Sequence, residues 1–110
     1  MDNPLRVLDA ARSVVNEINK LIDHSEERLL YDAQLRASAA SITANIREAY
    51  GRRKGAERNQ FLRFARGSAE ETDEHLRGNY AKARVKPALF WRLHNRLATI
   101  VKMLNAIMNT

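Results

Sequence analysis

The chain has no cysteine, and it carries only four glycines and two prolines among its 110 residues. Without cysteine, neither a disulfide framework nor a thiolate metal site can form. No segment reaches the about 18 consecutive apolar residues of a membrane-spanning helix, and no apolar run of signal-peptide length stands near the N-terminus. We therefore expect a cytoplasmic protein without a membrane partner. A chain of this length can bury a core without cross-links, so we expect residues 1–110 to form a single domain.

Enzyme motifs are also missing. His24, His75 and His94 are widely separated, and none belongs to a Glu-x-x-His pair of the kind that builds a di-iron bundle. Glu71 and His75 are four residues apart and supply at most half of a metal site. The sequence has no Gly-rich phosphate loop, no nucleophile motif and no arginine–histidine pair at the spacing of helical-bundle ribonucleases. We therefore expect no enzymatic activity, no cofactor, no metal and no small-molecule substrate.

Negative charge is absent from the last third of the chain, where seven basic residues and no acidic residue follow Glu74. The net charge of +6 is uneven elsewhere too: residues 1–34 carry four basic and seven acidic groups, whereas residues 47–66 carry seven basic and two acidic groups. This asymmetry favours a polyanion such as RNA or DNA as a partner. A solvated surface on a basic protein explains the sequence pattern equally well.

Apolar residues recur at helical spacing in four segments, and no segment alternates in the manner of a strand. The first segment opens with Asn3 as N-cap and Pro4 at the first helical position. Gly55 interrupts the chain between the second and third segments, and Lys86 with Pro87 marks the start of the last. The expected helices span residues 4–23, 27–52, 56–84 and 87–108. Amphipathic helices with short connections predict an all-α fold, an antiparallel up-down-up-down four-helix bundle.

A basic cluster surrounds the expected turn between the second and third helices. Arginine binds phosphate through two parallel hydrogen bonds, and such contacts tolerate any base sequence and weaken strongly with salt. Glu48 and Glu57 can neutralise part of the cluster by pairing with Arg52 and its neighbours. The residues that we expect to contact nucleic acid are Arg47, Arg52, Arg53, Lys54, Arg58, Arg63 and Arg66.

Polar residues beside the apolar stripe of the second helix predict a structural network rather than a catalytic site. In an antiparallel hairpin that closes near Gly55, residue i of the second helix lies level with about residue 109 − i of the third. We therefore expect Asn45 to form a hydrogen bond across the hairpin, near Ser68, and Arg36 to pair with Glu71. The full expected network is Arg36, Asn45, Glu48, Ser68 and Glu71.

Trp91 lies off the apolar stripe of the last helix, about 160° from Leu93 on a helical wheel. An outward-facing tryptophan is more often an interface anchor than a platform for base stacking, so we expect Trp91 at an oligomer interface. Phe90 and Tyr80 lie nearer the apolar stripes, and we expect them in the core or at its edge.

Two motifs and the end of the chain carry a family resemblance. In AQLRASAASITANIREAYGRR the matching residues are Gln34, Leu35, Arg36, Ser41, Ile42, Asn45, Ile46, Glu48, Tyr50, Gly51 and Arg52. In FLRFARGSAEETDEHL they are Phe61, Leu62, Ala65, Gly67, Ser68, Glu71 and Leu76. Together with the ending KMLNAIMN, these motifs resemble the four-helix bundle proteins encoded within intervening sequences of 23S ribosomal RNA genes. Thr43 and Ala49 stand where that family has proline and glycine, and both changes favour a straighter helix.

The resemblance implies a left-handed antiparallel bundle that assembles into a homo-oligomer, a ring of five subunits, without established enzymatic activity. Our first hypothesis is that this bundle binds the RNA or DNA backbone through its basic cluster, which a ring would repeat. The alternative is a protein–protein interaction scaffold whose charge serves only solubility. A passenger of a selfish element, with little function for its host, is a third reading of the same sequence.

Overall fold

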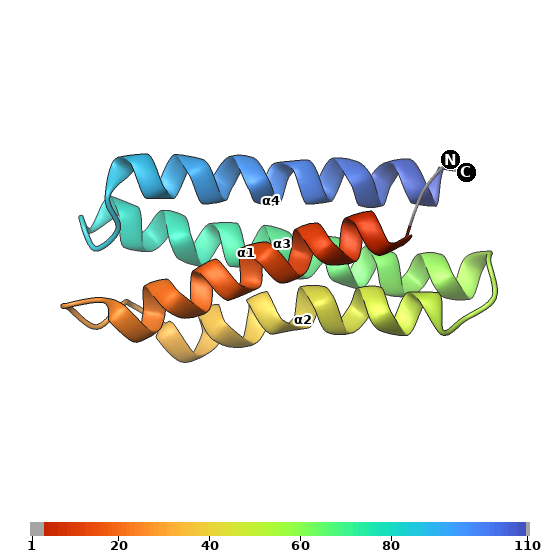
Figure 1. Ribbon diagram of the computed structural model, residues 1–110, viewed down its shortest axis with the longest axis horizontal. Coiled ribbons are helices and arrows are strands. Elements are labelled where there is room, and N and C mark those ends of the chain that lie inside the picture. Colours follow the sequence, from red (N-terminus) through yellow and green to blue (C-terminus); the bar gives the residue numbers. More distant parts are fainter. Residues whose placement is uncertain (1–3, 110) are drawn as a thin grey trace.

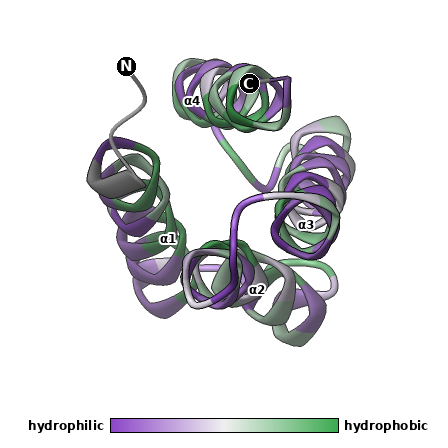
Figure 2. Ribbon diagram, turned by 90° about the vertical axis from the view of Figure 1, so that its right-hand side faces the viewer, coloured by the Kyte–Doolittle hydropathy of each residue, from purple (hydrophilic) through white to green (hydrophobic). Residues whose placement is uncertain are grey.

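The computed structural model describes residues 4–109 as a bundle of four helices (Figure 1). These are α1 (Pro4–His24), α2 (Asp32–Tyr50), α3 (Ala56–Ala81) and α4 (Pro87–Met108). Consecutive helices run in opposite directions along the long axis. α1 and α3 each contact both α2 and α4, so the four helices surround one core (Figure 2). The predicted all-α, antiparallel up-down-up-down bundle is therefore confirmed.

The starts of α1, α3 and α4 lie where the sequence predicts them. Pro87 begins α4 directly after Lys86, whose backbone is extended. Gly55 precedes α3 with φ 132°, a conformation that side-chain-bearing residues rarely adopt. The N-cap predicted at Asn3 lies outside the described residues.

The start predicted for the second helix, residue 27, is wrong, because residues 25–31 form a connection and α2 begins only at Asp32. The Ser25 hydroxyl donates a hydrogen bond to the Glu27 carbonyl, and Tyr31 takes the left-handed conformation with φ 52°, which interrupts a helix. Leu29, which lies within the range predicted for this helix, is buried in the core from this connection. Its apolar character therefore reports burial rather than helical structure.

Two helices also end earlier than predicted. α2 ends at Tyr50 instead of residue 52, and α3 ends at Ala81 instead of residue 84. Ala83 has φ 57°, and the Arg84 N–H donates to the Asn79 carbonyl at 2.8 Å. This geometry closes a helix by satisfying one of its last carbonyls, and it replaces the final turn that we expected.

The core is built from the apolar stripes that the sequence predicts, and each large buried side chain contributes about 1.5–3 kcal/mol. Phe90 is fully buried, and Tyr80 stacks on it with ring centroids 4.4 Å apart, so both expectations for these aromatics are confirmed. The other large buried side chains are Val7, Ile18, Leu35, Ile42, Ile46, Leu62, Leu76, Leu93, Leu97, Ile100 and Leu104.

Small polar side chains join α2 to α3. The Thr72 hydroxyl donates to the Ser38 hydroxyl at 2.9 Å, and the Ser68 hydroxyl donates to the Ser41 hydroxyl at 2.9 Å. The residue numbers of these pairs add to 110 and 109, so the predicted register of the hairpin is confirmed. Bulky residues would hold the helices apart, whereas these hydroxyls need a close approach to meet.

Asn79 fixes the same hairpin at its other end, where the connection before α2 passes α3. Its buried amide donates to the Leu30 carbonyl at 3.1 Å and to the His75 carbonyl at 2.9 Å, and its oxygen accepts from the Leu30 N–H at 2.7 Å. Every hydrogen-bonding group of the side chain is thereby used, and the Leu30 backbone is satisfied in return.

We expect Asn79→Ala to lower the free energy of unfolding by about 2–3 kcal/mol, because it removes three hydrogen bonds and leaves backbone groups of Leu30 without their partners. Urea denaturation followed by circular dichroism measures this loss. Asn95→Ala is the matched control, since Asn95 is exposed, and it should change stability by less than about 0.5 kcal/mol. Equal losses in the two variants would show that the Asn79 amide does not hold the connection.

Candidate nucleic-acid interface

The two halves of the bundle, taken along its long axis, differ in net charge. The up-down-up-down topology brings the start of α1, the turn between α2 and α3, and the end of α4 to one end of the molecule (Figure 1). We call residues 4–13, 42–67 and 98–109 the basic half, because they carry ten basic and three acidic groups. The balanced half, residues 14–41 and 68–97, carries nine of each sign. The positive charge of the protein is therefore concentrated in one half of the described structure.

Among the residues predicted to contact nucleic acid, Arg52 makes the most side-chain interactions within the protein. Its guanidinium donates to a Glu48 oxygen at 2.7 Å and to a Glu57 oxygen at 2.6 Å, as the sequence predicts, and it lies 4.8 Å from the centre of the Phe61 ring. The hydrogen bonds to Glu48 and Glu57 raise the pKa of Arg52 above its ordinary value. Because its donors are used within the protein, Arg52 braces the turn rather than offering a free charge.

Arg58 and Arg66 are also used within the bundle. Arg58 donates to the Arg52 carbonyl at 2.8 Å and lies 5.0 Å from the centre of the Tyr50 ring, while its buried Nε has no hydrogen-bond partner in the described structure. Arg66 donates to the Asn105 side-chain oxygen at 2.7 Å and so links α3 to α4. Both side chains are half-buried, which limits the contacts that they can make with a ligand.

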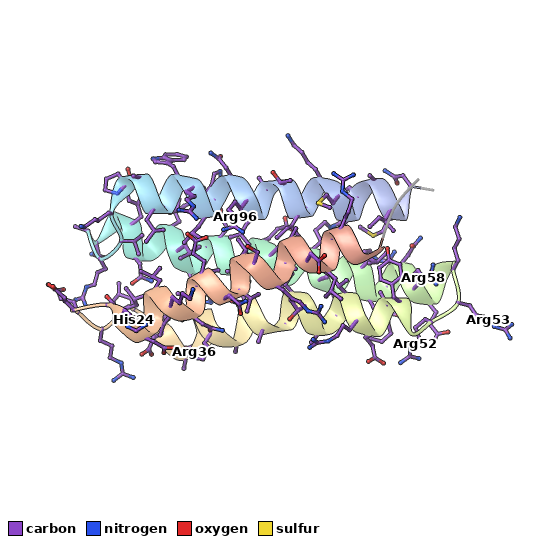
Figure 3. The ribbon with its side chains drawn as sticks, in the orientation of Figure 1. His24, Arg36, Arg52, Arg53, Arg58 and Arg96 are labelled. Atoms are coloured by element: carbon purple, nitrogen blue, oxygen red, sulfur yellow. The ribbon has the colours of Figure 1, made fainter. Side chains whose placement is uncertain are left out.

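The other four residues predicted to contact nucleic acid have no partner among the described residues. Their side chains are exposed and make no hydrogen bond or ion pair with any described residue. Figure 3 shows Arg53 projecting beyond the end of the bundle, away from Arg52 and Arg58. The free members of the predicted set are Arg47, Arg53, Lys54 and Arg63.

Sequence reasoning missed three further cations of the basic half. Arg6 and Arg12 on α1 and Lys102 on α4 are exposed and make no ion pair with any described residue. They are distant from the other cations in the sequence, but the bundle topology places them at the same end of the molecule. The predicted topology already contained this information, because the first and last helices must meet the turn between the second and third.

The predicted polar network forms with different partners. Asn45 does not bond across the hairpin: its amide donates to the Ser41 carbonyl and hydroxyl, both at 2.9 Å, and the Ser41 hydroxyl meets Ser68 instead. The short Asn45 side chain reaches the preceding turn of its own helix more easily than it reaches α3. Ser41, which was not in the expected network, therefore makes the contact across the hairpin that we expected of Asn45.

The predicted pairing of Arg36 with Glu71 is wrong. Arg36 donates to an Asp23 oxygen at 2.6 Å and to an Asn19 oxygen at 3.2 Å, so it connects α2 to α1. Glu71 lies 3.6 Å from the His75 ring, one turn along α3. The predicted position of Arg36 along the bundle axis agrees with the structure. The arginine lies, however, on the side of α2 that faces α1, not on the side that faces α3. Arg36 lies far from the basic turn, near the end that carries His24 (Figure 3).

Most ion pairs lie in the balanced half, where they pair most of its cations with carboxylates. Arg92 and Arg96 on α4 both reach Glu17 on α1, and Arg84 reaches Glu27. The cations of this half that make no ion pair with a described residue are Lys20, Lys82 and Lys86. The two halves therefore carry similar numbers of cations, ten and nine, but differ in how many of these make no ion pair with a described residue.

A groove of about 470 Å³ lies between α3 and α4. Leu97, Ala98 and Val101 contribute its apolar lining, and Glu70 and Glu74 contribute carboxylates. Asp73 and His94 also line it, with 2.8 Å between the His94 Nδ1 and an Asp73 oxygen.

Trp91 is exposed at 46% of its surface, as its outward position predicts, and it packs edge-on against Phe90 and His94. Its place at an oligomer interface stays a prediction.

Two other findings concern the described residues alone. Among residues 4–109, no group of three or more histidine or acidic side chains is placed to hold a metal ion. Within the same range, none of the helices has the length and apolar character needed to span a membrane.

Comparison with known proteins identifies a family and a fold. The family model described as 23S rRNA-intervening sequence protein matches residues 3–106. Among solved structures, the chain is similar to a protein of unknown function from the S23 ribosomal protein family of Bacteroides thetaiotaomicron. The two share 24% sequence identity and a TM-score of 0.89, over 97% of this chain and 98% of that one, which shows the common fold. No curated protein matches the chain.

Proposed function

The chain belongs to the 23S rRNA-intervening sequence protein family, and on that premise we propose that it is a cytoplasmic, non-enzymatic protein that binds the RNA or DNA backbone through its basic half. The observation that supports this proposal is the unequal distribution of free charge. Seven exposed cations of the basic half make no ion pair with a described residue, compared with three in the balanced half. A surface designed only for solubility has no need for this separation.

Phosphate is the ligand group that best fits these cations. Five of the seven free cations are arginines, which bind phosphate oxygens in pairs. Their side chains come from α1, α2, α3 and the turn between α2 and α3. Contacts to phosphates position a nucleic acid without reading its base sequence. Arg52, Arg58 and Arg66 hold the turn and the α3–α4 contact in place, so that the free cations extend from a rigid support.

We further propose that the protein is a homo-oligomer, a ring of five subunits in which Trp91 contacts a neighbouring subunit. An exposed tryptophan buries a large apolar area when it enters an interface, and tryptophan is among the residues that contribute most to binding. A ring would present several basic ends to one nucleic acid, so that weak phosphate contacts add up to a stable complex.

The first test removes free cations from the basic half. We expect the triple variant Arg53→Ala, Lys54→Ala, Arg63→Ala to bind a fluorescently labelled RNA about tenfold more weakly than the wild type at about 50 mM salt, because each lost cation removes a phosphate contact. Fluorescence anisotropy titration measures the affinity.

The matched control is the variant Lys20→Ala, Lys82→Ala, Lys86→Ala, which lowers the net charge equally but alters the free cations of the balanced half. We expect this control to bind within about twofold of the wild type. Equal weakening of the two variants would show that total charge, rather than the basic half, determines binding. Absence of binding by the wild type would refute the proposed function.

The second test concerns assembly. Sedimentation velocity should give the wild type a mass several times that of one chain, and Trp91→Ala should shift the protein towards the monomer because it removes an interface anchor. Tyr31→Ala is the control, since Tyr31 is the other large exposed aromatic side chain of the balanced half. A monomeric wild type, or an equal shift in both variants, would contradict the role of Trp91.

The groove between α3 and α4 favours a second candidate function, an interaction scaffold for a protein segment with basic side chains. Its apolar lining can accept an aliphatic side chain. Glu70 and Glu74, which pair with no described residue and outnumber the one lysine of the lining, Lys102, can accept lysine or arginine. The titrations above distinguish the two functions, because a scaffold of this kind predicts no RNA binding by the wild type.

A further inference from the structure

Phe64 is an exposed aromatic side chain of the basic half. It is 49% exposed, and Tyr31 and Trp91, the other large hydrophobic side chains with comparable exposure, belong to the balanced half. The exposed Arg63 precedes it in the chain, and the core does not require its ring, because Leu62 and Ala65 provide the buried face of this turn of α3. The buried core at this turn of α3 is therefore complete without the Phe64 ring.

The ring of Phe64 is nevertheless held in a defined position. It meets the ring of Phe61 edge-on, with centroids 5.8 Å apart and an angle of 89° between the planes. Phe61 in turn lies under the Arg52 guanidinium, which Glu48 and Glu57 hold from both sides. A ring supported in this way loses little conformational freedom when a flat ligand packs on it.

The neighbouring surface on α3 is open. Gly67 lies three residues after Phe64, which makes the two residues neighbours on the helix surface. A side-chain carbon placed at Gly67 would meet no atom within 4 Å. The helix surface one turn after Phe64 is therefore unobstructed at Gly67.

We propose that Phe64 is a stacking platform for an unpaired base, so that the preferred ligand of the basic half is single-stranded nucleic acid. This inference rests on the proposed function, in which the free cations hold the phosphate backbone. A base in a duplex is already stacked on its neighbours and cannot lie on a protein side chain, whereas an unpaired base can. Stacking on an aromatic ring adds affinity for any base, and it combines naturally with cations that follow the backbone.

The test compares one strand in its free and paired forms. The probes are a fluorescently labelled, mixed-sequence RNA strand of about twelve nucleotides that cannot fold on itself, within the usual length of single-strand sites, and the same strand paired with its full complement. We expect Phe64→Leu to weaken binding of the single strand about tenfold and to leave duplex binding within about twofold of the wild type. Phe64→Trp should retain single-strand binding, because it keeps an aromatic ring.

Tyr31→Leu is the control for loss of an exposed aromatic side chain elsewhere, and it should not reproduce the selective loss. If Phe64→Leu lowers binding of both probes equally or of neither, the stacking proposal is wrong and the backbone-binding function stands. If the wild type binds neither probe, the proposed function itself fails. Light scattering on Phe64→Leu completes the test, because a change of oligomer mass would assign Phe64 to a subunit contact and overturn the proposal.

Discussion

The close approach of α2 and α3 is the constraint on which the rest of the structure depends. Hydroxyl pairs meet only when two helices are near each other and in one register, and Ser38 with Thr72 and Ser41 with Ser68 fix that register from within the bundle. At the two ends of the hairpin, Asn79 holds the connection before α2 and Arg52 holds the turn. Small side chains thus permit the approach, and polar ones determine its level.

The register of α2 and α3 determines which end of the bundle carries the cations. With α2 and α3 aligned over their full length, the turn between them lies beside the start of α1 and the end of α4, and the cations of all these segments share one end (Figure 1). Arg52 shows how structure and proposed function are joined. It neutralises Glu48 and Glu57 and packs on Phe61, which in turn supports the exposed Phe64. An arginine whose hydrogen bonds stay within the protein can therefore position the ring that we propose to stack on a base.

Sequence pattern predicted the helices, the core and the register, because periodicity and hairpin geometry are local properties. It failed where a competing interaction decides the outcome. Leu29 lies in the range predicted for the second helix but is buried from an irregular connection. Arg36 lies at the expected level but on the face of α2 that meets Asp23. Within the basic cluster, sequence identified the cations but not their state: side-chain contacts alone distinguish the held Arg58 from the free Arg53.

The salt dependence of RNA binding tests the central claim most directly, because each phosphate contact releases counterions and the claim is that free cations of the basic half make such contacts. For a single strand bound by five to seven cations, the logarithm of the association constant should fall with the logarithm of salt concentration at a slope of about −3 to −5. A slope shallower than about −1, or no detectable binding at about 50 mM salt, would contradict the account.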